Sequence, residues 1–189
     1  MRKLLFTLLL ALTAITMTAQ GEVPKPKVSY KQITKLFHGK NPKSVLKGSG
    51  LKKYCYSYID KHLGYCTFGY NVQYEDCYAP LVPLTDDAFG ISYCDAGSGC
   101  WDIVFKDKAQ LEAYKKEAVD NGFLPIYEQW HSFVEDNVEK KQLIYAKDID
   151  EWMRDCFRIV FNGDYYQIRL ELEEKDDLIN EDINILQDI

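Results

Sequence analysis

The chain has 189 residues, 47% of them hydrophobic and 14% aromatic, which is the composition of a globular protein and excludes a disordered one. The formal net charge is −6, but the charges are unevenly distributed. Ten lysines and two acids lie between Glu22 and Lys61, whereas 11 basic and 27 acidic residues follow. The simplest interpretation is a solvated basic helix face beside an acidic body.

Residues 1–19 have the pattern of a secretory signal peptide. A two-residue basic start precedes an apolar stretch from Leu4 to Ala14, and small residues lead to Ala19. Threonines interrupt this region, which makes it too polar for a membrane-spanning helix of roughly 20 residues. We therefore expect a mature chain that begins near Gln20, has no membrane span and is exported to the periplasm or the extracellular space.

Two helical segments and four strands are expected next. Ser29 is a typical N-cap residue, and apolar residues at helical spacing follow it until Gly39 ends the helix. A second short helical segment runs from Lys43 to Lys47. Alternating β-branched and aromatic residues then predict strands at Tyr54 to Ile59, Gly64 to Val72, Phe89 to Cys94 and Cys100 to Phe105, with a loop from Gln73 to Ala88.

The clearest helix signal opens the second part of the chain. Asp107 is the expected N-cap, Gln110 stands at capping-box spacing and Asn121-Gly122 ends the helix. Asn162-Gly163 is a hairpin signal between the last two strands. The four strands predicted in this part are Phe123 to Tyr127, Gln142 to Ala146, Cys156 to Phe161 and Tyr165 to Leu172.

A helix followed by four strands therefore occurs twice, over residues 20–106 and 107–175, before an acidic tail at 176–189. We predict an α+β fold in which antiparallel sheet dominates and two helices pack on one face, with the two halves as candidate pseudo-repeats. In this order of elements the chain resembles the secreted beta-lactamase inhibitory proteins. That resemblance implies two such units forming a long concave antiparallel sheet, and it transfers no inhibitory residue to this sequence.

The six cysteines of an exported chain are expected to be disulfide-bonded or able to form disulfides. Cys94 and Cys100 flank a five-residue turn with two glycines, so we predict a bond between them that stabilises the fold by about 2 kcal/mol. Cys77 is expected to pair with Cys55 or Cys66. Cys156 is expected to be free and buried.

The sequence contains no clear catalytic or metal-binding motif. The three histidines His38, His62 and His131 are separated in sequence, and no cysteine or histidine pair has the spacing of a zinc site. Adjacent acids such as Asp86 and Asp87 do not supply two carboxyl groups facing each other across a cleft. We therefore expect no metal and no other cofactor.

Tyrosine is the compositional feature that favours a function, because eight of the 14 tyrosines fall between residues 54 and 93. Side chains two apart in a strand point the same way, so Tyr54, Tyr56 and Tyr58 are expected to share one face. That face is either a binding surface for a partner or part of the core. The candidate binding residues are Tyr54, Tyr56, Tyr58, Tyr70, Tyr74, Tyr78 and Trp101.

The leading functional hypothesis is an exported, non-catalytic binding module, with inhibition as one form of its action, that recognises a protein or a carbohydrate. Nucleic acid is not an expected partner, because the lysine-rich segment contains no arginine and would be exported away from cytosolic nucleic acid. One alternative is a secreted hydrolase whose site involves Cys66, Cys77 or His131. Another is a structural envelope protein that associates with itself.

Overall fold

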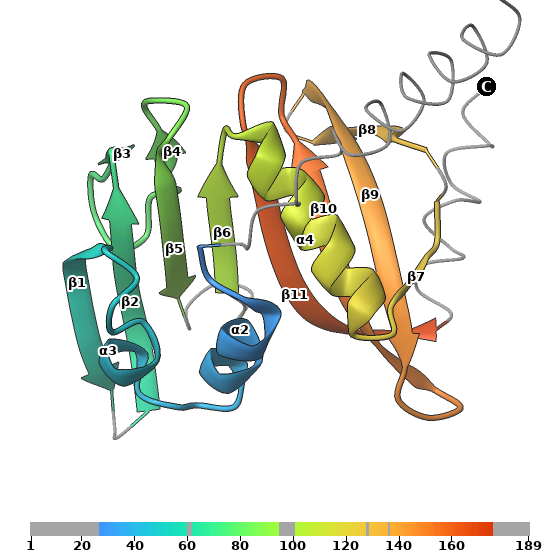
Figure 1. The fold of residues 1–189 in the computed structure, drawn as a ribbon, viewed down its shortest axis with the longest axis horizontal. Coiled ribbons are helices and arrows are strands. Elements are labelled where there is room, and N and C mark those ends of the chain that lie inside the picture. Colours follow the sequence, from blue (N-terminus) through green and yellow to red (C-terminus); the bar gives the residue numbers. More distant parts are fainter. Residues whose placement is uncertain (1–26, 60–61, 95–100, 128, 136, 176–189) are drawn as a thin grey trace, which may run out of the picture.

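A single antiparallel sheet organises the part of the chain that the structure, a computed structural model, describes (Figure 1). The described residues are 27–59, 62–94, 101–127, 129–135 and 137–175. The expected signal peptide, Cys100 and the acidic tail at 176–189 lie outside them.

The sheet has nine strands, all paired antiparallel. Its central order is β1 (Lys52–Ile59), β2 (His62–Tyr70), β5 (Phe89–Cys94), β6 (Trp101–Phe105), β11 (Tyr166–Glu174), β10 (Met153–Phe161) and β9 (Val138–Asp148). Both β7 (Leu124–Pro125) and β8 (His131–Glu135) pair with β9, while β3 (Val72–Gln73) and β4 (Val82–Pro83) form a separate pair. The predicted α+β fold dominated by antiparallel sheet is confirmed.

The two predicted halves meet in the middle of this sheet. Strands β1, β2, β5 and β6 form one meander, β8 to β11 form another, and their last strands β6 and β11 are neighbours. In this pairing Phe105 lies opposite Tyr166 and Trp101 opposite Leu170. Whether the halves are repeats of one unit stays a prediction.

Helices cover one face of the sheet, here called the helix face (Figure 1). They are α2 (Tyr30–Phe37), α3 (Pro42–Val45) and α4 (Lys108–Asp120). The short α3 is the helical segment expected from Lys43, so three described helices lie on this face where the predicted fold has two. The other side of the sheet is called the back face.

The helix caps differ from the predicted pattern in one respect. Ser29 and Gln32 form a capping box at the start of α2. Asp107 caps α4 as predicted, accepting the Ala109 N–H. Gln110, however, does not complete a capping box, because its side-chain oxygen accepts the backbone N–H of Lys27 at 2.9 Å. The expected local contact is thus replaced by one that fastens the N-terminal segment to α4.

The main core lies between the helices and the helix face. Trp101, Phe105, Tyr114 and Phe157 are among its fully buried side chains. The Tyr114 hydroxyl donates a 2.7 Å hydrogen bond to the Val28 carbonyl, which satisfies both polar groups inside the core. A smaller cluster on the back face consists of Val72, Leu81, Ala88 and Val104.

The strand predictions were wrong in three places. Strand β8 was not expected, and β4 lies inside the segment predicted as a loop from Gln73 to Ala88, where it pairs with β3, which spans the junction between that loop and the strand predicted to end at Val72. Conversely, the strand expected from Phe123 to Tyr127 is reduced to β7, whose Pro125 has no N–H to donate to a ladder. Short pairings such as these depend on their neighbours more than on intrinsic propensity.

Candidate functional site

The candidate site lies on the lysine-rich segment of the chain. Between Lys27 and Ile59 the sequence contains eight lysines and no aspartate or glutamate. This segment folds into α2, α3 and β1; α3 and β1 lie together at one end of the sheet, whereas α2 lies nearer its middle, beside β6 and α4 (Figure 1). Four exposed lysines, Lys43, Lys47, Lys52 and Lys53, therefore lie on α3, β1 and the link between them, at one end of a protein whose net charge is −6.

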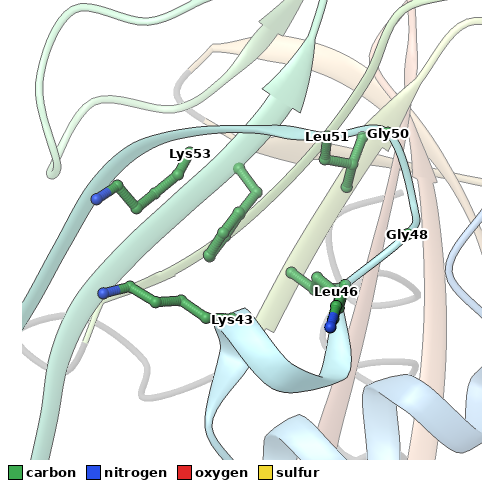
Figure 2. Close-up of a pocket in the computed structure, with 8 residues that line it drawn as sticks. Lys43, Leu46, Gly48, Gly50, Leu51 and Lys53 are labelled. Atoms are coloured by element: carbon green, nitrogen blue, oxygen red, sulfur yellow. The ribbon is translucent and has the colours of Figure 1, made fainter.

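A cavity of about 710 Å³ opens between α3 and the start of β1. Its apolar lining comes from Leu46, Leu51 and Phe68. Positive φ angles at Gly48 (84°) and Gly50 (79°) turn the connecting segment around it, a conformation that favours glycine. Figure 2 shows these elements around the opening.

Three lysines, Lys43, Lys47 and Lys53, also line this cavity, and their side chains are exposed. Figure 2 shows Lys43 and Lys53 extending along the same side of the opening. None of the three forms an ion pair with a residue that the structure describes. Their positive charges are therefore available to an anionic group from outside the chain.

Two tyrosines of β1 continue this surface. The Lys43 ammonium lies 4.3 Å from the centre of the Tyr56 ring, and the Tyr56 hydroxyl hydrogen-bonds to that of Tyr58 at 2.9 Å. Burial, together with this hydrogen bond, raises the pKa of Tyr56 above its ordinary value. Tyr58 remains 47% exposed. We call Lys43, Lys47, Lys53, Tyr56 and Tyr58 the lysine–tyrosine surface.

The prediction that Tyr54, Tyr56 and Tyr58 share one face is wrong. The register of β1 against β2 shifts between Lys53 and Cys55, and a shift of this kind re-aims the side chains that follow it. Tyr54 consequently packs on the back-face cluster, whereas Tyr56 packs against the main core on the helix face.

The other predicted binding residues are dispersed. Trp101 is only 2% exposed and belongs to the core, so it presents no surface to a partner. Tyr74 stacks on Tyr54 at the back face, and exposed Tyr78 lies beside Tyr65. Tyr70 is exposed at the end of β2 under the ammonium of Lys27.

Of the predicted set, the structure therefore brings only Tyr56 and Tyr58 to the lysines. Sequence reasoning did not single out Lys43, Lys47 and Lys53 as site residues. The signal that could have found them is the absence of acids from the surrounding 33 residues, 27–59, in a chain that is acidic elsewhere.

The proposed cysteine–histidine site is not assembled in the described part of the chain. Cys66 is buried on the helix face, Cys77 lies in a loop over the back face, and His131 stacks on Tyr127 with ring centres 4.7 Å apart. Burial, aided by nearby Cys55, raises the pKa of the Cys66 thiol, which disfavours the thiolate that a nucleophile requires.

The five described cysteines are free thiols, and Cys156 is buried as predicted. The Cys94–Cys100 bond stays a prediction, because Cys100 lies outside the described residues.

No family model, curated protein or solved structure matches this chain. None of the described helices is long and apolar enough to cross a membrane. Across the described ranges, no group of three or more histidine, cysteine, aspartate or glutamate residues is arranged to hold a metal ion.

Proposed function

We propose that the protein is an exported, non-catalytic binding module that recognises an acidic carbohydrate or an acidic protein segment through the lysine–tyrosine surface. The observation that carries this proposal is the placement of Lys43, Lys47 and Lys53 around an open pocket with a partly apolar lining, without ion-pair partners among the described residues.

The chemistry of this surface suits a ligand that combines negative charge with apolar area. Carboxylate, sulfate or phosphate groups would pair with the lysine ammonium groups, whose flexible stems adapt to different spacings. The exposed ring of Tyr58 offers a rigid contact for a sugar ring or an apolar side chain. The apolar part would contact mainly the partly exposed Leu51, because Leu46 and Phe68 are each only 5% exposed.

Binding assays with two acidic polymers test the proposal. Isothermal titration with dextran sulfate and with poly-L-glutamate is expected to show binding, and neutral dextran is expected to show none. Changing Lys43, Lys47 and Lys53 together to Gln should weaken binding of the acidic polymers by at least about tenfold, because three surface charge pairs are lost.

The matched control removes the same charge elsewhere. Lys108, Lys141 and Lys147 are exposed, lie outside the lysine-rich segment and have no ion-pair partner in the described part of the chain, and changing all three to Gln should alter affinity by less than about twofold. Equal losses in the two triple variants would mean that the polymers respond to net charge alone, and the proposed surface would be rejected.

A second pair of variants tests the tyrosine part of the surface. Tyr58→Ala is expected to weaken dextran sulfate binding about threefold through loss of its ring contact. Tyr78→Ala removes a more exposed ring on the other side of the sheet and should leave affinity unchanged. If Tyr78→Ala weakens binding and Tyr58→Ala does not, the polymer binds at the back face instead.

Export is the third part of the proposal, and the sequence of residues 1–19 supports it. N-terminal sequencing of the protein recovered from outside the cytosol should give a first residue near Gln20. Recovery in the cytosol with Met1 retained would contradict export without affecting the binding assays.

A further inference from the structure

A folded-back loop covers part of the back face. Its base is the β3–β4 pair, in which Val72 lies opposite Pro83 and Gln73 opposite Val82. At its tip the Asp76 carboxylate accepts the backbone N–H groups of Tyr78 and Ala79 at 2.7 and 2.8 Å. Cys77 therefore occupies a defined turn.

Two ring contacts fix where this turn lies on the sheet. Tyr74 stacks on Tyr54 of β1 with ring centres 5.0 Å apart, and Tyr78 contacts Tyr65 of β2 at 6.1 Å. The chain neighbours of these rings are Cys55 and Cys77, because Cys55 follows Tyr54 and Cys77 precedes Tyr78. The turn thus brings Cys77 over the back face of the β1–β2 pair.

Strand register decides which thiols share this face. Cys55 is paired with Thr67, and Cys94 is paired with Tyr65, two residues before Thr67 on the same strand. Cys55 and Cys94 therefore both point to the back face. Cys66 stands between Tyr65 and Thr67, so it points the other way, into the main core.

Local electrostatics agree with this arrangement. Partial desolvation raises the pKa of Cys77, and the nearby Cys55 thiol raises it further, with a smaller effect from Cys94. A hydrogen bond with the Cys55 thiol raises the pKa of Tyr74, which belongs to the same loop as Cys77. Cys55, Cys77 and Cys94 are each only partly buried, so a small oxidant can reach them.

We propose that Cys55 and Cys77 are a disulfide site that closes when a low-molecular-weight disulfide such as oxidised glutathione is present. One protein thiolate attacks the glutathione disulfide and releases one glutathione; the second protein thiolate then attacks the mixed disulfide and releases the other. The two protein thiols lose two protons to solvent and are oxidised to the disulfide, while the two released glutathione thiolates take up two protons, so one glutathione disulfide is reduced to two thiols with no net change in protons. This proposal does not rest on the proposed function.

The cross-link would fasten the loop to the edge of the sheet. The alternative pairing of Cys77 with Cys66 is excluded because the Cys66 side chain lies on the opposite face of the sheet. The cross-link also leaves Cys94 available for Cys100, and Cys66 and Cys156 as buried thiols.

Peptide mapping of the full chain tests the site directly. The protein is equilibrated with oxidised glutathione, remaining thiols are blocked with N-ethylmaleimide, and the unreduced chain is digested with trypsin and a protease that cuts before aspartate. Cleavage after Lys53 and Lys61 and before Asp76, Asp86 and Asp95 separates the thiols. The resulting peptides carry Cys55, Cys66, Cys77, Cys94 and Cys100 one at a time.

The expected product is a linked pair of the Cys55 and Cys77 peptides. Cys55→Ser and Cys77→Ser should each abolish it, whereas Cys94→Ser should leave it intact. Closing this loop should raise the Tm of the oxidised wild type by roughly 5–10 °C relative to the reduced protein. In Cys77→Ser, oxidation should not produce this rise in Tm. A linkage of Cys77 to Cys94 or Cys66, or full alkylation of both Cys55 and Cys77 after oxidation, would overturn the proposal.

Discussion

At the residue scale, Arg158 on the back face forms a network of charged hydrogen bonds. Its guanidinium donates to Glu171 at 2.6 Å, to Glu173 at 2.6 Å and to Gln142 at 2.8 Å. Only 17% of the Arg158 side chain is exposed, and both carboxylates are largely buried. The two carboxylates raise the pKa of Arg158 despite its burial, so it stays charged. The group is a structural network rather than a ligand site, because its donors face acceptors from the same sheet.

Removing the Arg158 cation from this network should lower the stability of the protein. Arg158→Met is expected to lower the free energy of unfolding by about 3 kcal/mol, because Glu171 and Glu173 would remain buried without a counter-charge. Urea denaturation measures the loss. Adding Glu171→Gln and Glu173→Gln should restore part of it. As a control, Lys116→Met removes an exposed pair with Asp120 and should cost less than about 1 kcal/mol. If Arg158→Met and Lys116→Met lower the free energy of unfolding equally, burial of the Arg158 network adds nothing to stability.

A second residue-scale prediction concerns pH. Hydrogen bonds from Thr85 and then Asn71 hold the pKa of the Asp87 carboxyl below its ordinary value near 3.8. Because the pKa is lower in the folded state than in the unfolded one, the stabilisation is present above pH 3.8 and is lost as the pH falls through the folded-state pKa. Thr85→Val should move the carboxyl titration, followed by carbon NMR, up towards the ordinary value.

Asp150 provides the internal control for that titration. Its pKa is also lowered, but by the backbone N–H groups of Trp152 and Met153, far along the chain from Thr85. Thr85→Val should leave Asp150 unchanged. A shift of both carboxyls would point to a general loosening of the fold instead of a local hydrogen bond.

At the element scale, the back face of β5 lets the loop that contains Leu81 pack close to the strand backbone at Gly90. A Cβ atom placed on Gly90 would lie 2.7 Å from Leu81 and 3.0 Å from Val104, so the loop packs directly against the strand backbone. Gly90→Ala is therefore expected to destabilise the protein by about 1–3 kcal/mol through overpacking. Thermal or urea unfolding measures the change.

A double-mutant cycle separates this steric effect from a loss of strand propensity. In a Leu81→Ala background the nearest contact of the new methyl group is gone, so Gly90→Ala should cost less than it does in the wild type. Strictly additive costs would show that the loop does not press on β5.

The elements also show what local sequence can and cannot reveal. The signals for α2, α4 and the Asn162-Gly163 hairpin are contained within a few residues, and these predictions are confirmed. The face of Tyr54 was not predictable, because it depends on a register shift against β2 that leaves the tyrosine alternation intact. The role of Gln110 was hidden for a related reason, since its partner Lys27 lies 83 residues away.

At the scale of the whole molecule, the predicted halves share one core. Tyr30 of α2 packs against Phe123 and Phe157, and the Tyr114 hydroxyl of α4 binds the Val28 carbonyl. The sequence could indicate two similar strings of elements but not their joint, because β6 and β11 are separated by about 60 residues. The lysine–tyrosine surface was missed for a similar reason: its cavity exists only once α3 is placed beside β1.

Such a shared core should unfold as one unit. Ile103 on β6 is 1% exposed and lies opposite both Ile91 of β5 and Ile168 of β11. Ile103→Ala should cost about 2–5 kcal/mol, as expected for a large-to-small change in a packed core. Because the contacts between halves are buried, amide hydrogen exchange should become faster by the same factor in β2 and in β10, which lie on opposite sides of the β6–β11 joint. Leu124→Ala, at an exposed site on β7, should leave amide exchange unchanged in both β2 and β10. If protection fell in β2 alone while β10 kept its wild-type exchange, the two meanders would be separate folding units and the joint between β6 and β11 only a contact between them.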